Sequence, residues 1–160
     1  MSEASADAAK PQTPTIIQYA GDDFFIATTP GGRAVTVDVK GGRRAAAGPL
    51  ELFVVGLGSC TAADVISILH KKREKVSAYR VEILTSRREE HPQAFTRIEL
   101  KHVVQGTHLS ADAVERAIAL STEKYCSAIA TVRATAEIAT SYEIVEETPE
   151  LSNLPRTTFP

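Results

Sequence analysis

The chain contains two cysteines, Cys60 in the segment LGSCTAADVISIL and Cys126 in the segment EKYCSAIA. Both lie among small and apolar residues, so four roles are open: buried hydrophobes, a structural disulfide, metal ligands, or partners in one redox reaction. A zinc site needs about four ligands, and no histidine shows paired spacing with either cysteine (His70, His91, His102, His108). We therefore expect no metal site, and the residues alone favour inert packing.

A redox reaction requires that the two sulfur atoms meet. Each cysteine is expected at or near a helix, so two packed helical segments would bring them together, and a helix N-terminus would favour a Cys60 thiolate. Asp64 follows four residues later on the same helix face, and its carboxylate disfavours a thiolate. A redox-active Cys60 would therefore need a nearby cation, for which the chain offers six candidates: Arg33, Arg43, Arg44, Arg87, Arg88 and Arg133.

The elements that must position the cysteines follow from periodicity and turn signals. Three short strands separated by Gly-Asp-Asp and Pro-Gly-Gly turns predict a meander over residues 15–39, and Pro49 opens a long, almost wholly apolar helix over residues 50–69. Such a helix is expected to be buried on most sides, by its own sheet or by a partner subunit. Next come a strand hairpin, a helix capped by Ser110 with one inward face (Val114, Ala117, Ile118, Ser121, Tyr125) that ends at Cys126, and a last strand. The order βββ-α-ββ-α-β, without βαβ alternation, indicates an α+β fold.

Composition limits the class of protein. The chain has 160 residues, a net charge of −2, 43% apolar and 24% charged residues, which fits a soluble globular domain and argues against nucleic-acid binding or a basic membrane anchor. Residues 1–14 are expected to form a disordered tail without a secretory signal, residues 15–147 a single domain, and residues 148–160 a second tail. We expect a cytoplasmic protein that spans no membrane. In the cytoplasm, a cysteine pair is more often catalytic or metal-binding than structural.

Three segments together resemble the OsmC/Ohr family of osmotically inducible and organic-hydroperoxide-resistance proteins. They are GPLELFVVGLGSCTAADVISILHKKR, SRREEHPQAFTRIELKHVVQG and LSTEKYCSAIATV, which keep the order and spacing of both cysteine motifs. The resemblance covers about residues 30–147 and is closest to the general OsmC-like branch. It implies an intertwined homodimer in which two sheets wrap around long central helices and the active sites form between subunits.

The resemblance also implies a reaction, a thiol-dependent reduction of organic hydroperoxides in defence against oxidative stress, with hydrogen peroxide as a further candidate substrate. Cys60 would be the peroxidatic cysteine and Cys126 the resolving one, with no bound cofactor. An external dithiol, such as a protein-bound lipoyl group, would reduce the resulting disulfide.

Two supporting residues depart from the family pattern. In the hydroperoxide-resistance branch a glutamate directly follows the proline before the first cysteine, whereas here Glu51 is displaced by one position, about 100° around a helix. Glu51 therefore either supports catalysis or only favours the helix N-terminus. Arg33, in a Gly-Gly-Arg turn, is the candidate partner of the thiolate, or else an ordinary exposed arginine at a strand end.

Two other functions remain open on the same residues. The dimer would also suit a non-enzymatic binder of an apolar small molecule in an inter-subunit pocket lined by the cysteines. Covalent catalysis by Cys60 on an acyl substrate is a third possibility, which, unlike peroxide reduction, needs no resolving thiol.

Overall fold

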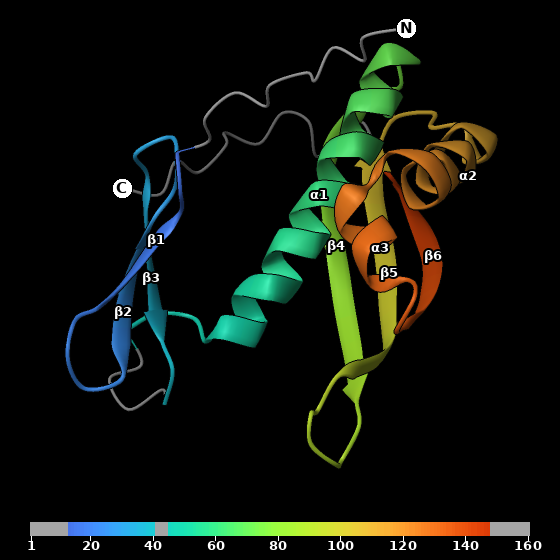
Figure 1. Ribbon diagram of the computed structural model, residues 1–160. Helices are drawn as coiled ribbons and strands as arrows, with labels where there is room; N and C mark the ends of the chain where they lie inside the picture. The colour runs from blue at the N-terminus through green and yellow to red at the C-terminus, as the bar shows by residue number, and fades with distance from the viewer. Residues whose placement is uncertain (1–12, 41–44, 148–160) are drawn as a thin grey trace, which may run out of the picture. The chain divides into compact units, whose positions relative to one another are not determined.

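The structure, a computed structural model, describes residues 13–40 and 45–147 (Figure 1). The chain divides into two compact units, residues 1–53 and 54–160. The sequence predictions for most of the N-terminal tail, for Arg43 and Arg44, and for the C-terminal tail fall outside the described residues. The single domain expected over residues 15–147 stays a prediction.

The first unit contains the predicted meander. Strands β1 (Ile16–Tyr19), β2 (Phe24–Thr28) and β3 (Ala34–Asp38) pair antiparallel in that order. Gly21 and Gly32 have φ angles of +92° and +74°, conformations that glycine adopts without a steric penalty. Both turns were expected from the sequence, and the meander is confirmed.

Helix α1 (Pro49–Lys71) begins in the first unit with proline at its first position, as predicted. Glu51 accepts a hydrogen bond from the Gly48 N–H at 2.7 Å, so its side chain caps the helix in the manner of the glutamate of a capping box. By its length and composition alone, the helix could cross a membrane. The core helix of a soluble protein meets the same two criteria. Only one stripe of it is buried within the chain (Leu57, Gly58, Thr61, Val65, Leu69).

The second unit is built on a three-stranded sheet in the order β4 (Val76–Arg87), β5 (Phe95–Gly106) and β6 (Glu137–Glu146). Strands β4 and β5 form the predicted hairpin, whereas β6 runs parallel to β5. A parallel return requires a long crossover, and the helices between β5 and β6 supply it. The chain thus contains one β-helix-β crossover that the sequence pattern did not predict, within the α+β fold that it did.

Three helical segments fill this crossover: α2 (Ala111–Leu120), the π-helical turn η1 (Ser121–Tyr125) and the short α3 (Ser127–Val132). Ser110 caps α2 as expected, because its hydroxyl accepts the Ala113 N–H at 3.3 Å. Together with α1, these segments cover one face of the sheet (Figure 1).

The core between helices and sheet consists of two apolar clusters. The Cys126 cluster holds the side chains near the cysteines (Leu57, Ile98, Leu100, Cys126, Ile129, Val132, Ala136), and the Val114 cluster holds those near α2 (Val65, Leu69, Val104, Ala113, Val114, Ala117, Ile118). Three polar side chains are fully buried among these apolar residues: Thr61 on α1, His102 on β5 and Ser121 in η1. Each of the three segments thus contributes one polar group to an otherwise apolar core.

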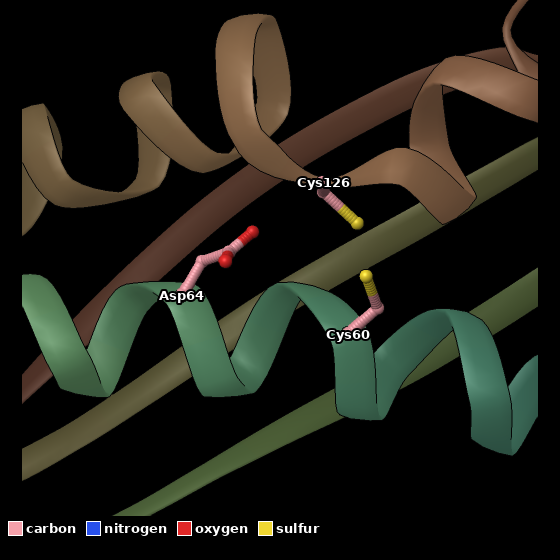
Figure 2. Close-up of side chains that lie close together, drawn as sticks. All are labelled: Cys60, Asp64 and Cys126. Carbon is pink, nitrogen blue, oxygen red and sulfur yellow. The ribbon is translucent and has the colours of Figure 1, made fainter. Parts of the chain in front are cut away.

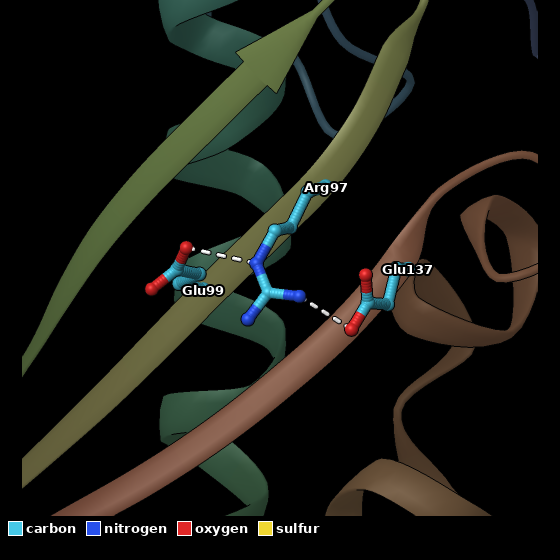
Figure 3. A network of polar contacts seen from close by, with 3 residues as sticks. All are labelled: Arg97, Glu99 and Glu137. Atoms are coloured by element: carbon cyan, nitrogen blue, oxygen red, sulfur yellow. Dashed lines mark hydrogen bonds and ion pairs between the residues drawn. The ribbon is translucent and has the colours of Figure 1, made fainter.

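The opposite face of the sheet is exposed and charged. Arg97 on β5 lies between Glu99 on its own strand and Glu137 on β6, and forms an ion pair with each (Figure 3). Exposed pairs of this kind contribute little to stability. Their alternation with inward apolar residues nevertheless fixes which face of the strands meets the helices.

Candidate functional site

Cys60, Asp64 and Cys126 meet at the boundary between α1 and the crossover helices (Figure 2). Both cysteines are free thiols, and their two Sγ atoms and a carboxylate oxygen of Asp64 all lie within 4.8 Å of one another. Cys60 and Asp64 are half-buried, while Cys126 is only 3% exposed. The condition for a redox pair, that the two sulfur atoms meet, is therefore fulfilled within one chain.

Helix α1 delivers two of these groups because Cys60 and Asp64 are four residues apart and share one helix face. Gly58, just before Cys60, allows the helix to pack closely on the sheet. A β-carbon at this position would come within 2.3 Å of the Ile83 Cδ1 atom on β4. The glycine thus serves the close packing of α1 on the sheet.

The π-helical turn η1 decides the placement of Cys126. The Cys126 N–H donates to the Ser121 carbonyl at 2.9 Å, a bond across five residues, and the wider turn rotates the following residues relative to an α-helix. Tyr125, expected on the inward face, is therefore 50% exposed, and Cys126 occupies the buried position. The prediction for Tyr125 was wrong because an uninterrupted α-helical period does not hold through residue 125.

A chain of hydroxyl hydrogen bonds ties η1 to α1 beside the cysteines. The Ser121 hydroxyl donates to Asp64 Oδ2 at 3.0 Å and lies 2.9 Å from the Thr61 hydroxyl. Since the single Ser121 proton goes to the carboxylate, Thr61 is the donor to Ser121. Asp64 thus has a hydrogen-bond partner within its own chain.

The environment of Cys126 favours its protonated form. Burial, together with the hydrogen bond and the charge of Cys60, raises the pKa of the Cys126 thiol to about 11. The Ile129 N–H donates to Cys126 Sγ at 3.5 Å and, with the Ala128 N–H, acts in the opposite direction. Burial dominates, so Cys126 is a thiol at neutral pH.

Glu51 and Arg33, the other predicted site residues, belong to the first unit. The Glu51 carboxylate caps helix α1, and the Arg33 backbone N–H donates to the Thr29 hydroxyl at 3.2 Å in the turn before β3. Their roles beside Cys60 stay predictions. In the second unit, the Arg133 guanidinium donates to the Thr122 carbonyl in η1, which anchors the turn that carries Cys126.

Two hollows adjoin the cysteine site. One of about 480 Å³ is lined by Asp64, Ser67, Ile68, Lys71, Leu120 and Tyr125. A smaller one, of about 100 Å³, reaches Cys126 along the residues of η1 and the start of α3. Both hollows include Tyr125, whose exposed ring thus lies between them.

Comparison with known proteins identifies the family. The model of the OsmC-like protein family matches residues 40–141. The chain belongs to the OsmC-like family. Protein YhfA of Escherichia coli strain K12 is 39% identical over 121 residues, which cover 76% of this chain and 90% of YhfA. The predicted resemblance is thereby confirmed.

Solved structures agree with this assignment. A hypothetical protein from Aquifex aeolicus VF5 is similar with a TM-score of 0.75 and 32% identity, over 84% of this chain and 97% of that one. An organic hydroperoxide resistance protein from Legionella pneumophila shares the fold at 18% identity, with a TM-score of 0.58 over 84% and 99% of the two chains. The α+β fold of the OsmC-like type is confirmed.

Sequence reasoning missed the residues that hold the site together. Thr61 and Ser121 were read only as a small residue near Cys60 and as part of a helix face. The hydrogen bond between the half-buried Tyr79 and the buried His102, whose hydroxyl and Nδ1 atoms are 2.7 Å apart, was not predicted from the sequence either. The available clue was a polar residue within each apolar stripe, since buried polar groups require partners.

Proposed function

We propose that the protein is a two-cysteine thiol peroxidase that reduces organic hydroperoxides, and hydrogen peroxide as a smaller substrate. The observation that carries the proposal is the meeting of two free thiols from separate helical segments, their sulfur atoms within 4.8 Å. A disulfide requires an S–S distance of about 2.05 Å, so only a small movement separates the reduced pair from the bonded one.

The difference in exposure supports the two proposed roles. Cys60 is half-buried and Cys126 is buried, so a substrate reaches Cys60 first. The Cys60 thiolate attacks one peroxide oxygen, the O–O bond breaks, and the leaving alkoxide takes a proton to become an alcohol. Cys60 becomes a sulfenic acid, which Cys126 attacks to form the disulfide and release water.

The electrostatics of Cys126 fit this order of events. The charge of Cys60 is one of the smaller causes that raise the pKa of Cys126, and this charge is absent once Cys60 is a neutral sulfenic acid. Its pKa then falls, and Cys126 becomes a better nucleophile only after the peroxide has reacted. The Ile129 N–H at 3.5 Å supports the thiolate that forms at that moment.

The substrate's organic part has a suitable place in the larger hollow beside Asp64, where Ile68, Leu120 and Tyr125 offer apolar contacts. The exposed apolar side chains of α1, including Phe53 and Val55, support a homodimer that would cover them. We propose that a cytoplasmic dithiol, such as a protein-bound lipoyl group, reduces the disulfide by exchange. Arg33 and Glu51 keep their proposed supporting roles.

The test is a thiol titration of the reduced, metal-free protein before and after one equivalent of cumene hydroperoxide, with intact mass measured alongside. We expect the loss of both thiols and a mass change of about −2 Da. In Cys126→Ser the reaction should stop at a sulfenic acid, about +16 Da, and Cys60→Ser should not react.

A second candidate function rests on the same hollow, which would also hold an apolar ligand without any chemistry. Two thiols that survive the peroxide in the wild-type protein would reject the peroxidase and favour this binder. The binder would then be supported if an apolar fluorescent probe binds to the wild-type protein and this binding is lost when Leu120 is replaced by a charged residue.

A further inference from the structure

The cysteine site also has the composition of a metal site. Cys60 Sγ, Cys126 Sγ and one carboxylate oxygen of Asp64 lie within 4.8 Å of one another (Figure 2). In a tetrahedral zinc site, with Zn–S bonds of about 2.3 Å and Zn–O bonds of about 2.1 Å, neighbouring donor atoms are roughly 3.5 to 3.8 Å apart. A contraction of about 1 Å, within reach of small side-chain rotations, would complete this geometry.

The three donors come from two packed helical segments rather than from one flexible loop. Cys60 and Asp64 are one turn apart on α1, in the middle of a helix of 23 residues. Cys126 is held between η1 and α3, at the N-cap of α3. Such donors are largely positioned before a metal arrives, which lowers the entropic cost of binding.

Neighbouring hydrogen bonds orient the donors as they do around known metal ligands. The Ser121 hydroxyl donates to Asp64 Oδ2 at 3.0 Å and is itself held by Thr61, which fixes the carboxylate beside the two sulfur atoms. The Ile129 N–H donates to Cys126 Sγ, a bond that stabilises a thiolate. Within the described part of the chain, no ion pair neutralises Asp64.

The donor chemistry selects the metal. Two thiolates are soft ligands that suit zinc, and hard cations such as magnesium prefer all-oxygen sites. Two thiolates and one carboxylate carry three negative charges, which a divalent cation offsets to a net charge of −1. Three protein ligands leave a fourth position for water, as in zinc sites that remain open.

We propose that the reduced protein binds one Zn²⁺ ion through Cys60, Asp64 and Cys126. Two S–H bonds break, two Zn–S bonds and one Zn–O bond form, two protons pass to the solvent, and no electrons move. Binding needs neither peroxide nor a reductant, so it does not depend on the proposed peroxidase activity. A bound ion would occupy both thiols and keep them from oxidation.

The experiment uses the full chain, reduced and freed of metal, in a peroxide-free buffer. Zn²⁺ is titrated against a chromophoric chelator, and Co²⁺ is titrated separately because its absorption reports thiolate ligands and tetrahedral geometry. We expect one ion per chain, release of about two protons per Zn²⁺, and a cobalt spectrum with sulfur-to-metal charge transfer.

Variants locate the site. Cys60→Ser and Cys126→Ser should each weaken Zn²⁺ binding by roughly 100-fold or more, and Asp64→Asn and Ser121→Ala by about 10-fold or more. His108→Asn is the matched control, because this exposed imidazole is an ordinary adventitious zinc ligand, and its loss should leave the affinity unchanged. Thiol oxidation by diamide should abolish binding.

Zinc affinity that survives both cysteine substitutions, or a cobalt spectrum without charge-transfer bands, would overturn the proposal. The spectrum keeps the test decisive even if one variant folds poorly. Since the peroxide titration is done without metal and the zinc titration without peroxide, failure of either hypothesis leaves the other measurable.

Discussion

The hydrogen bonds between Ser121 and helix α1 are expected to contribute most of the specific energy that holds the two cysteines together. Ser121→Ala removes one bond to the Asp64 carboxylate and one to the Thr61 hydroxyl, 3.0 and 2.9 Å long. Both Ser121 and Thr61 are fully buried, so water cannot replace the lost partner of Thr61. The substitution changes little volume, which makes it a clean test of these bonds.

The magnitude follows from the nature of the two bonds. A bond to a charged group contributes about 1.5–3 kcal/mol and a neutral one about 0.5–1.5 kcal/mol. Because Asp64 is half-buried and regains some hydration, we take the lower part of this range. We expect Ser121→Ala to lower the free energy of unfolding by about 2–3 kcal/mol.

Chemical denaturation of the reduced, metal-free protein measures this free energy. A double-mutant cycle with Asp64→Ala separates the Ser121–Asp64 bond from the rest, and we expect a coupling energy of about 1–2 kcal/mol. The matched control is Ser127→Ala, an exposed serine at the start of α3, which should change stability by less than about 0.5 kcal/mol.

The reasoning would be refuted by a coupling energy below about 0.3 kcal/mol, or by a Ser127→Ala variant as unstable as Ser121→Ala. A further consequence concerns the site: without this link the cysteines are held less closely. Disulfide formation after peroxide treatment should therefore be slower in Ser121→Ala, although both thiols remain.

Two more predictions concern acid stability and Glu51. Burial lowers the pKa of His102 to about 4, below its ordinary value near 6.5, so the unfolded chain binds the proton first; the resulting stability is present above pH 6.5 and is lost as the pH falls towards 4. We expect a loss of about 3 kcal/mol from this group. It is measured as the difference in the pH dependence of unfolding between the wild type and His102→Gln, whose amide can also hydrogen-bond with Tyr79; parallel curves would contradict it. Glu51→Gln keeps the bond to Gly48 and should preserve the free energy of unfolding within about 0.5 kcal/mol. Glu51→Ala should lower this free energy by about 1 kcal/mol. A large loss of peroxide turnover in Glu51→Gln, at unchanged stability, would show a catalytic role.

Much of the fold could be read from the sequence because its signals are local. Glycine turns separate the first three strands, Pro49 marks the start of α1, and period-two alternation marks the hairpin. These features depend only on backbone preferences and on which face of a segment is apolar. The same local reasoning placed Cys60 and Asp64 on one helix face, which the structure confirms.

The parallel return of β6 and the turn before Cys126 could not be read in this way. Strand direction is set by how the crossover helices pack on the sheet, and no residue of β6 encodes it. The π-helical turn places Ser121 in the core and Cys126 beside Cys60, at the expense of Tyr125, which turns outward. Hydrogen bonds from Ser121 tie this turn to Thr61 and Asp64 on α1, contacts that a helical period extended from α2 does not reveal.

The sequence by itself determined the types of reactive groups, two thiols and a carboxylate, and the helix that carries two of them. Only the tertiary structure decided that the third group meets them, because residues 60 and 126 are brought together by helices packed on the same face of the sheet. Their protonation depends on that same packing, since burial raises the pKa of Cys126. A cysteine's chemistry is set by its surroundings, and those surroundings exist only in the folded chain.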